Sequence, residues 1–307
     1  MTIYDVAVIG EIYVDHVFTG FAQWPQPGEE VFTTEYVQEL GGGAAITACA
    51  LGQLGRSVKL VGLVGRHELP WIAQRLAQFG VESTGLLSSE TGTGVTVSIS
   101  SRVERSFFTY VGVNAQLRDP LVATAILESV SQARHVHLAF PIEHGLAGKL
   151  LQRAQQAGCT TSLDVGHQPQ WLLKAENQAI CARIDYLLPN EREARILAAG
   201  DAYDYLHFTQ SRNWPSGVVK MGAQGALMRD RTGTVRVPAC DVETIDTTGA
   251  GDAFDAGFID GLLDGESSAE CLRRGCICGS LSTRAAGALN GIPDRQDFAR
   301  CYEETYG

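Results

Sequence analysis

The chain has 307 residues, of which 45% are hydrophobic and 19% charged, so it can bury the core of one large α/β domain or of two smaller ones. The net charge of -11 argues against binding to nucleic acid or to an anionic membrane, because both require a basic surface. Since no apolar run reaches membrane-spanning length, no signal peptide is evident and the eight cysteines are scattered, we expect a reduced, cytoplasmic protein.

Continuous apolar runs alternate with helical patterns along most of the chain. The predicted strands are Tyr4–Gly10, Val58–Val64, His135–Ala139, Thr161–Asp164, Tyr186–Leu188 and Gly217–Lys220. The predicted helices are Ala44–Leu54, Leu69–Phe79, Leu121–Ser129, Ala147–Ala157, Arg192–Ala199, Ala250–Leu263 and Ala269–Ala286. Strands that are apolar throughout are buried on both sides, so we expect an α/β fold with a mostly parallel central sheet and helices on both faces.

Two segments, Val14–Leu40 and Thr93–Val113, interrupt this alternation and show the period-two pattern of strands with one polar face. In the second segment, for example, Val97 separates Thr96 from Ser98. We predict that the two segments form one small β-sheet that projects from the large domain as a lid. The large domain then comprises residues 1–13, 41–92 and 114–307.

The sequence DTTGAGD at residues 246–252 opens directly into a pattern of small and apolar residues that predicts a helix. Gly249 and Gly251 allow the main chain to approach a ligand closely, and the first amides of the helix suit an anion. Asp252 adds a carboxylate to this anion site, which is useful if it takes a proton from an alcohol that then attacks a phosphate. Alternatively, Asp252 only stabilises the first helical turn, and the motif alone leaves both roles open.

Three further motifs accompany this segment. They are Gly41-Gly42-Gly43-Ala44-Ala45 before a predicted helix, Asn190-Glu191-Arg192-Glu193 after an apolar strand, and Lys220-Met221-Gly222-Ala223-Gln224-Gly225 between two strands. In this order and spacing the motifs resemble those of the ribokinase-like (PfkB) family of sugar kinases, and the resemblance extends from Gly10 to Ala288. It implies a ribokinase-like fold and phosphoryl transfer from ATP, with Mg²⁺, to a hydroxyl group of a small sugar or sugar derivative.

The resemblance assigns Asp252 as the general base and the turn of Gly249, Ala250 and Gly251 as the anion hole for the transferring group. It also places Asp164, at the end of a predicted strand, near the phosphates.

For the nucleotide, the resemblance implies contacts from Lys220, Gly222, Gly225, Thr247 and Asn190. Glycines at such positions let the backbone lie against a base or a phosphate. An ordinary hairpin turn would also explain the glycines after Lys220. The loop is not a Walker A loop, because no GxxxxGK[ST] sequence occurs in the chain.

Two cation sites follow from the resemblance. Asn190 and Glu193 would organise Mg²⁺ through water, and an amide and a carboxylate oxygen suit this hard cation. The same two residues also match a capping box, and both roles can hold together. Asp246 and Thr248 would contribute to a K⁺ site, in which Gly291 stands where ribokinase has a serine ligand.

In the sugar site, the resemblance implies that Asp15 accepts hydrogen bonds from sugar hydroxyls and that Gly42 and Gly43 approach the sugar. Two residues depart from ribokinase, which has Asn at the positions of Tyr13 and Ile46. These departures argue for an acceptor other than plain ribose.

Other functions fit less well. A nucleoside kinase of the same fold stays open as an alternative, and a non-catalytic sugar-binding regulator is disfavoured because Asp252 and the glycines are retained. A dinucleotide oxidoreductase is excluded because no GxGxxG follows the first strand. His135 and His137 share one face of a strand, and without a third ligand nearby in sequence we expect packing or hydrogen bonding rather than metal binding. The exposed lid edges favour a homodimer joined through the lids.

Overall fold

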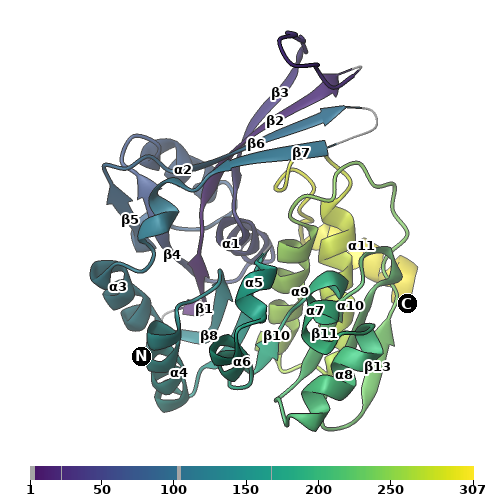
Figure 1. Cartoon of the computed structure of the whole chain (residues 1–307). Coiled ribbons are helices and arrows are strands. Elements are labelled where there is room, and N and C mark those ends of the chain that lie inside the picture. The colour runs from purple at the N-terminus through teal and green to yellow at the C-terminus, as the bar shows by residue number, and fades with distance from the viewer. Residues whose placement is uncertain (1–3, 22, 102–104, 167) are drawn as a thin grey trace.

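The computed structural model describes residues 4–21, 23–101, 105–166 and 168–307. Its main body contains a six-stranded parallel sheet with the strand order β10-β9-β8-β1-β4-β5 (Figure 1). The strands are β1 (Tyr4–Gly10), β4 (Val58–Gly65), β5 (Leu86–Ser89), β8 (Ala133–Ala139), β9 (Thr160–Asp164) and β10 (Tyr186–Leu187). The sequence predicted each of them except β5, whose short LLSS sequence lacks an extended apolar run.

Helices cover both faces of this sheet, as predicted. The helices of the described residues are α1 (Gly43–Gln53), α2 (Leu69–Ala77), α3 (Pro120–Val130), α4 (His144–Ala157), α5 (Pro169–Leu172), α6 (Ala175–Cys181), α7 (Glu191–Ala198), α8 (Ala202–Ser211), α9 (Ala250–Asp264), α10 (Ser268–Ser282) and α11 (Arg295–Tyr306). Side chains of α1, α2 and α9 pack on one face of the sheet, and those of α3, α4 and α6 pack on the other. In the described residues, no helix is long and apolar enough to cross a bilayer.

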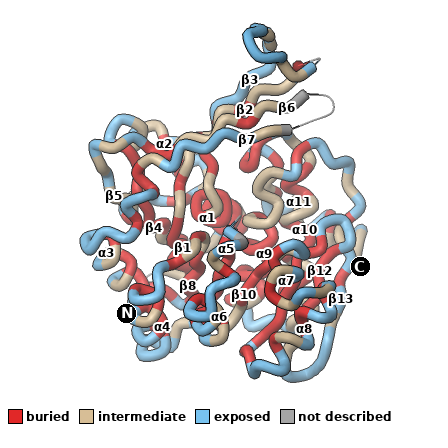
Figure 2. Tube along the Cα trace, viewed as in Figure 1, coloured by how far each residue is buried: buried red, intermediate tan, exposed pale blue. Residues whose placement is uncertain are grey.

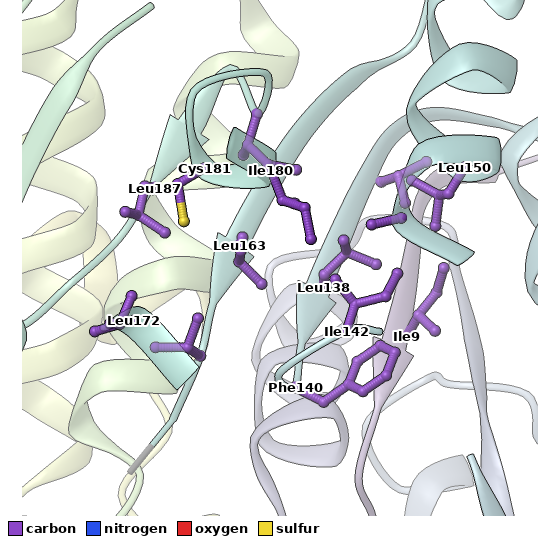
Figure 3. Packing of buried hydrophobic residues seen from close by; sticks show 14 of the residues in the cluster. Ile9, Leu138, Phe140, Ile142, Leu150, Leu163, Leu172, Ile180, Cys181 and Leu187 are labelled. Atoms are coloured by element: carbon purple, nitrogen blue, oxygen red, sulfur yellow. The ribbon is translucent and has the colours of Figure 1, made fainter. Parts of the chain in front are cut away.

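The core lies between the sheet and these helices, where buried residues concentrate (Figure 2). Ile9, Leu138 and Leu163 come from three neighbouring strands and belong to one cluster with Leu150 of α4 and Ile180 of α6 (Figure 3). Removing each such side chain from water contributes about 1.5–3 kcal/mol to folding. This burial holds the strand ends, which carry the polar side chains described below, in fixed positions.

The two segments that interrupt the helix–strand alternation form a four-stranded sheet with the order β3-β2-β6-β7. Its strands are β2 (Tyr13–Phe21), β3 (Glu35–Gly41), β6 (Gly94–Ser101) and β7 (Arg105–Tyr110). β2 pairs antiparallel with β3 and parallel with β6, and β6 pairs antiparallel with β7. This small sheet projects from the main body at the top of Figure 1.

The segment Gly217–Lys220 differs from its prediction. It forms β11, which belongs to a three-stranded antiparallel sheet with β12 (Ala226–Arg229) and β13 (Thr234–Val237) instead of the central sheet. The short turn at Gly222 and Gly225, both with positive φ, reverses the chain and pairs β11 with β12. A single parallel bridge between Asn190 and Lys220 links β11 to the region beyond β10.

The helix predicted to reach Ala286 ends at Ser282. Beyond it the carbonyl oxygen of Thr283 accepts hydrogen bonds from the amides of Ile245 and Asp246, so the chain leaves the helix to contact the loop before α9. The helices α5, α6, α8 and α11 were not predicted. Two of them are very short, and α8 and α11 begin at aspartate caps within polar sequence.

Candidate active site

Asp252 lies in the first turn of α9, directly after the glycine turn. Gly249 precedes the helix with a φ of 74°, a left-handed conformation that glycine adopts without strain. The hydroxyl of Thr47 in α1 donates a hydrogen bond of 3.2 Å to the carbonyl oxygen of Asp252. The first turn of α9 is therefore fixed against α1.

The early glycine motif contacts two carboxylates. A Cβ atom at position 43 would lie 2.9 Å from Oδ1 of Asp252, and a Cβ atom at position 41 would lie 2.1 Å from Oδ2 of Asp15. Gly42, between them, has a φ of 91° and packs against the carbonyl of Glu11. The structure thus brings together the two motifs that the sequence places at opposite ends of the chain.

The environment of Asp252 suits a proton acceptor. Burial raises its pKa to about 7, the charge of Asp164 adds to this increase, and the ammonium group of Lys220 opposes it. A carboxylate with a pKa near neutrality can accept a proton from an alcohol and release it again.

Lys220 lies in a cluster of carboxylates. Its Nζ donates hydrogen bonds to Oδ2 of Asp164 at 2.5 Å and to Oδ1 of Asp255 at 3.0 Å. Burial acts to lower the pKa of Lys220, but the two carboxylates raise it above its ordinary value. For Asp164, burial acts to raise the pKa, but the ammonium group of Lys220 holds that pKa below its ordinary value. For Asp255, burial raises the pKa well above its ordinary value.

Two buried histidines, His135 and His137, are hydrogen-bonded to hydroxyl groups of β9. Ser162 Oγ lies 2.7 Å from Nε2 of His135 and 2.8 Å from Nδ1 of His137, and Thr160 Oγ1 lies 2.7 Å from Nδ1 of His135. Burial lowers the pKa of His135 to about 3 and that of His137 to about 4, so both rings are neutral. The expectation of hydrogen bonding is confirmed for both residues.

Asn190 and Glu193 form a complete capping box at the start of α7. Asn190 Oδ1 accepts from the amide of Glu193 at 3.0 Å, and Glu193 Oε2 accepts from the amide of Asn190 at 2.9 Å. Burial raises the pKa of Glu193 to about 7, with Asp164 adding to the increase and Lys220 opposing it. The cap uses Oε2 of Glu193, so a water-mediated contact between the other oxygen and a cation is compatible with it.

A cavity of 380 Å³ opens beside this capping box. It is lined by Asn190, Glu191, Arg192, Arg195, Lys220 and Gly222. Three of these lining residues are among those the sequence analysis associated with the nucleotide. The two arginines are exposed, and with Lys220 they make the charged side chains of the lining mostly basic.

The loop before α9 is joined to the loop after α10 through Asp246. Its Oδ1 accepts from the amide and the hydroxyl of Thr248 at 2.9 and 2.7 Å, and its Oδ2 accepts from the amide of Gly287 at 2.9 Å. A Cβ atom at position 291 would lie 2.1 Å from the carbonyl oxygen of Ser282. The residues named for a cation site therefore lie together, and hydrogen bonds use both carboxylate oxygens of Asp246.

The two residues that depart from ribokinase have different environments. Ile46 is 3% exposed, and its Cδ1 and Cγ2 would each lie 3.2 Å from a Cβ atom at position 249. Tyr13 is partly exposed and its hydroxyl donates to Oε2 of Glu11 at 3.1 Å. Ile46 thus packs against the glycine turn, while Tyr13 is near the base of the small sheet.

Sequence reasoning missed Asp255 and Asn114. Asp255 is fully buried, and its signal is a charged residue flanked by apolar residues in α9. Asn114 is 4% exposed and pairs with both backbone groups of Ile12, at 3.2 and 2.9 Å, which fixes the connection between β1 and β2. Nothing in the local sequence of Asn114 indicated this contact.

The chain is similar to known proteins over nearly its whole length. The family model described as "pfkB family carbohydrate kinase" matches residues 4–295. A ribokinase from Haemophilus influenzae is 28% identical over 304 residues, covering 95% of this chain and 96% of that protein. Ribokinase of Arabidopsis thaliana, solved with ribose and ATP, superposes with a TM-score of 0.83 at 23% identity and covers 98% of this chain and 99% of its own. A Burkholderia thailandensis nucleoside kinase, solved with inosine, has a TM-score of 0.79 at 20% identity and covers 98% and 99%.

Proposed function

The chain belongs to the pfkB family of carbohydrate kinases, enzymes that transfer phosphate to an alcohol, and we propose that it transfers the γ-phosphate of ATP to a hydroxyl group of a small sugar or sugar derivative. One observation carries the proposal: the partly buried Asp252 carboxylate lies in the first turn of α9, against Gly43 and beside the glycine turn. A proton acceptor and the first amides of a helix, which suit an anion, therefore lie close together.

In this mechanism, Asp252 orients the acceptor hydroxyl group and removes its proton as the new phosphorus–oxygen bond forms and the bond from the γ-phosphorus to the bridging oxygen breaks, with ADP as the leaving group. The amides of Ala250, Gly251 and Asp252 stabilise the negative charge on the transferring group. The small sheet covers the acceptor and excludes water, which would otherwise compete for the phosphate. Mg²⁺, when bound, neutralises phosphate charge, and Asn190 and Glu193 would hold its water ligands.

We place the nucleotide phosphates between the glycine turn and the 380 Å³ cavity beside Asn190 and Gly222. The adenosine portion would then lie along the loop that includes Gly225, with Thr247 on the opposite side. Asp246 and Thr248 would contribute to a K⁺ site that orders the loop before α9. Since all eight cysteines are free thiols, the cytoplasm is the compartment that we propose.

For the acceptor, Asp15 supplies a carboxylate over Gly41 that can accept hydrogen bonds from two hydroxyl groups. Ile46 offers no hydrogen bond, and Tyr13 offers a ring face, so we propose a hydroxymethyl-bearing sugar other than plain ribose. A nucleoside is the second candidate, because the partly exposed ring of Tyr13 also suits a larger, flatter substituent and a structural neighbour binds inosine.

We further propose a homodimer joined through the small sheets. By strand register, His16, Phe18, Tyr36, Val97 and Phe108 lie on one face, opposite to the face that carries Asp15. The rings of Phe18 and Tyr36 are 4.9 Å apart, and Phe108 is 57% exposed. An exposed aromatic face of this kind is typical of a protein interface.

The test is ATP consumption across free sugars, sugar phosphates and nucleosides, with Asp252→Asn as the control for each positive compound. We expect at least one sugar or nucleoside to support turnover that the variant loses. ATP consumption equal in both proteins, or none with any acceptor, contradicts the proposal.

A further inference from the structure

Three elements meet at the ammonium group of Lys220. β11 supplies Lys220 itself, β9 ends in Asp164, and the second turn of α9 supplies Asp255. Lys220 and Asp164 are each 8% exposed, and Asp255 is completely buried. A buried cation that bridges two carboxylates on separate elements fixes those elements relative to one another, because separating any pair leaves a charge without a partner in a low-dielectric interior.

The ammonium group of Lys220 also lies close to the glycine turn. A Cβ atom at position 251 would be 3.4 Å from Nζ of Lys220. Asp255 follows Asp252 by three residues, so the two carboxylates share one side of α9. Oxygens of Asp164, Asp252 and Asp255 all lie within 4.8 Å of one another. Without the cation, these carboxylates would repel one another and displace the first turn of the helix.

We propose that Lys220 and Asp255 are positioning residues for phosphoryl transfer, which hold the anion-hole turn and Asp252 in the reactive arrangement. The proposal rests on the function proposed above and assigns Lys220 a role different from the nucleotide contact expected from the sequence. Since Asp164 and Asp255 take two of its three donor hydrogens from within the protein, we assign Lys220 an effect on the reaction that is exerted through Asp252 and the turn.

Lys220→Met removes the charge and keeps the length of the side chain. We expect kcat to fall about 100-fold, since a displacement of about 1 Å in reacting groups has this effect, while KM for ATP and acceptor changes less than about threefold. The dissociation constant for ATP, measured by calorimetry, should change equally little. This binding measurement needs no acceptor, so it remains informative even if the screen finds none and the proposed function fails.

The matched control is Arg274→Met. Arg274 pairs with Asp260 and Asp264 at the other end of the same helix, far along α9 from the glycine turn. We expect Arg274→Met to lower the thermal midpoint as Lys220→Met does, but to leave kcat within about twofold of wild type. A purely structural role for Lys220 would make the two variants alike in kcat, and this result would overturn the proposal.

If Lys220→Met does not fold, Asp255 provides the second test. Asp255→Asn keeps an oxygen that accepts a hydrogen bond from Lys220. Asp255→Leu removes this oxygen and keeps a side chain of similar size. We expect the Asn variant to retain kcat within about fivefold and the Leu variant to lose at least about 30-fold, both with unchanged KM. Equal kcat in the Asn and Leu variants, or a loss confined to ATP binding, contradicts the positioning role.

Discussion

The carboxylate of Asp252 lies against the α-carbon of Gly43, where a Cβ atom would come within 2.9 Å of Oδ1. Asp252 lies in the first turn of α9, and Gly43 is the first residue of α1. The hydrogen bond from Thr47 to the carbonyl oxygen of Asp252 holds the starts of the two helices together. The glycine motif therefore provides the space in which the carboxylate lies, and the predictions below follow from this arrangement.

Asp252→Asn should abolish turnover while ATP still binds. The amide keeps the shape of the side chain but cannot accept a proton from the acceptor, and loss of a general base typically costs about 10²- to 10⁴-fold in rate. Steady-state kinetics with the true acceptor and calorimetry with ATP measure the two effects. A near-normal kcat in the variant would show that another group is the base.

The pH dependence of kcat/KM should follow the ionisation of Asp252. Burial raises its pKa to about 7, and only the ionised form accepts a proton, so activity should rise with pH and level off above about 7. On the acidic side the slope should approach tenfold per pH unit. The acceptor should be one that does not titrate between about pH 5 and 8. A kcat/KM that does not change over this range would contradict the prediction.

Gly41→Ala should weaken acceptor binding more than catalysis. The added methyl group would overlap the carboxylate of Asp15, which must then move away from the sugar site. Loss of a charged hydrogen-bond partner costs about 1.5–3 kcal/mol, so we expect KM for the acceptor to rise about 10- to 100-fold. Gly148→Ala in α4 is the matched control, because no atom lies within 4 Å of the new methyl group and kinetics should not change. An unchanged KM for the acceptor in Gly41→Ala would show that Asp15 does not bind the acceptor.

Ile46→Asn should shift acceptor preference toward ribose and cost stability. The new amide would enter an apolar cluster beside Gly249 and Ala288, and an unpaired buried amide costs about 1–3 kcal/mol. A sugar hydroxyl group could satisfy it and recover part of this energy. Ratios of kcat/KM for ribose, fructose-type sugars and nucleosides measure the shift, with Ile46→Leu as the control. Ribose as the best wild-type substrate, or an unchanged ranking in Ile46→Asn, would refute the acceptor proposal.

Phe108→Glu should convert a dimer into monomers. Phe108 pairs with Val97 on the aromatic face of the small sheet, and a charge there would be desolvated without a partner. Sedimentation at micromolar concentration measures the species present. Leu121→Glu, at a 79% exposed position in α3, should leave the dimer intact. A monomeric wild-type protein contradicts the dimer itself.

The sequence determined the architecture of the main body, because buried parallel strands require uninterrupted apolar runs. Tyr4–Gly10 and Val58–Gly65 have such runs, and both were predicted almost to the residue. β5 has no such run, and Gly217–Lys220 has one but pairs elsewhere. An apolar run indicates burial, but it does not indicate which neighbour a strand pairs with.

The sequence also singled out Asp252 and the glycine turn as candidates, since a motif of contiguous residues carries its own geometry. Only the tertiary structure showed the ion pairs of Lys220, whose partners Asp164 and Asp255 come from two other elements. The sequence gives the spacing of residues along the chain, whereas an ion pair depends on distance in space. That distance is set by how β9, β11 and α9 pack, so the buried cluster beside the glycine turn could be found only in the folded molecule.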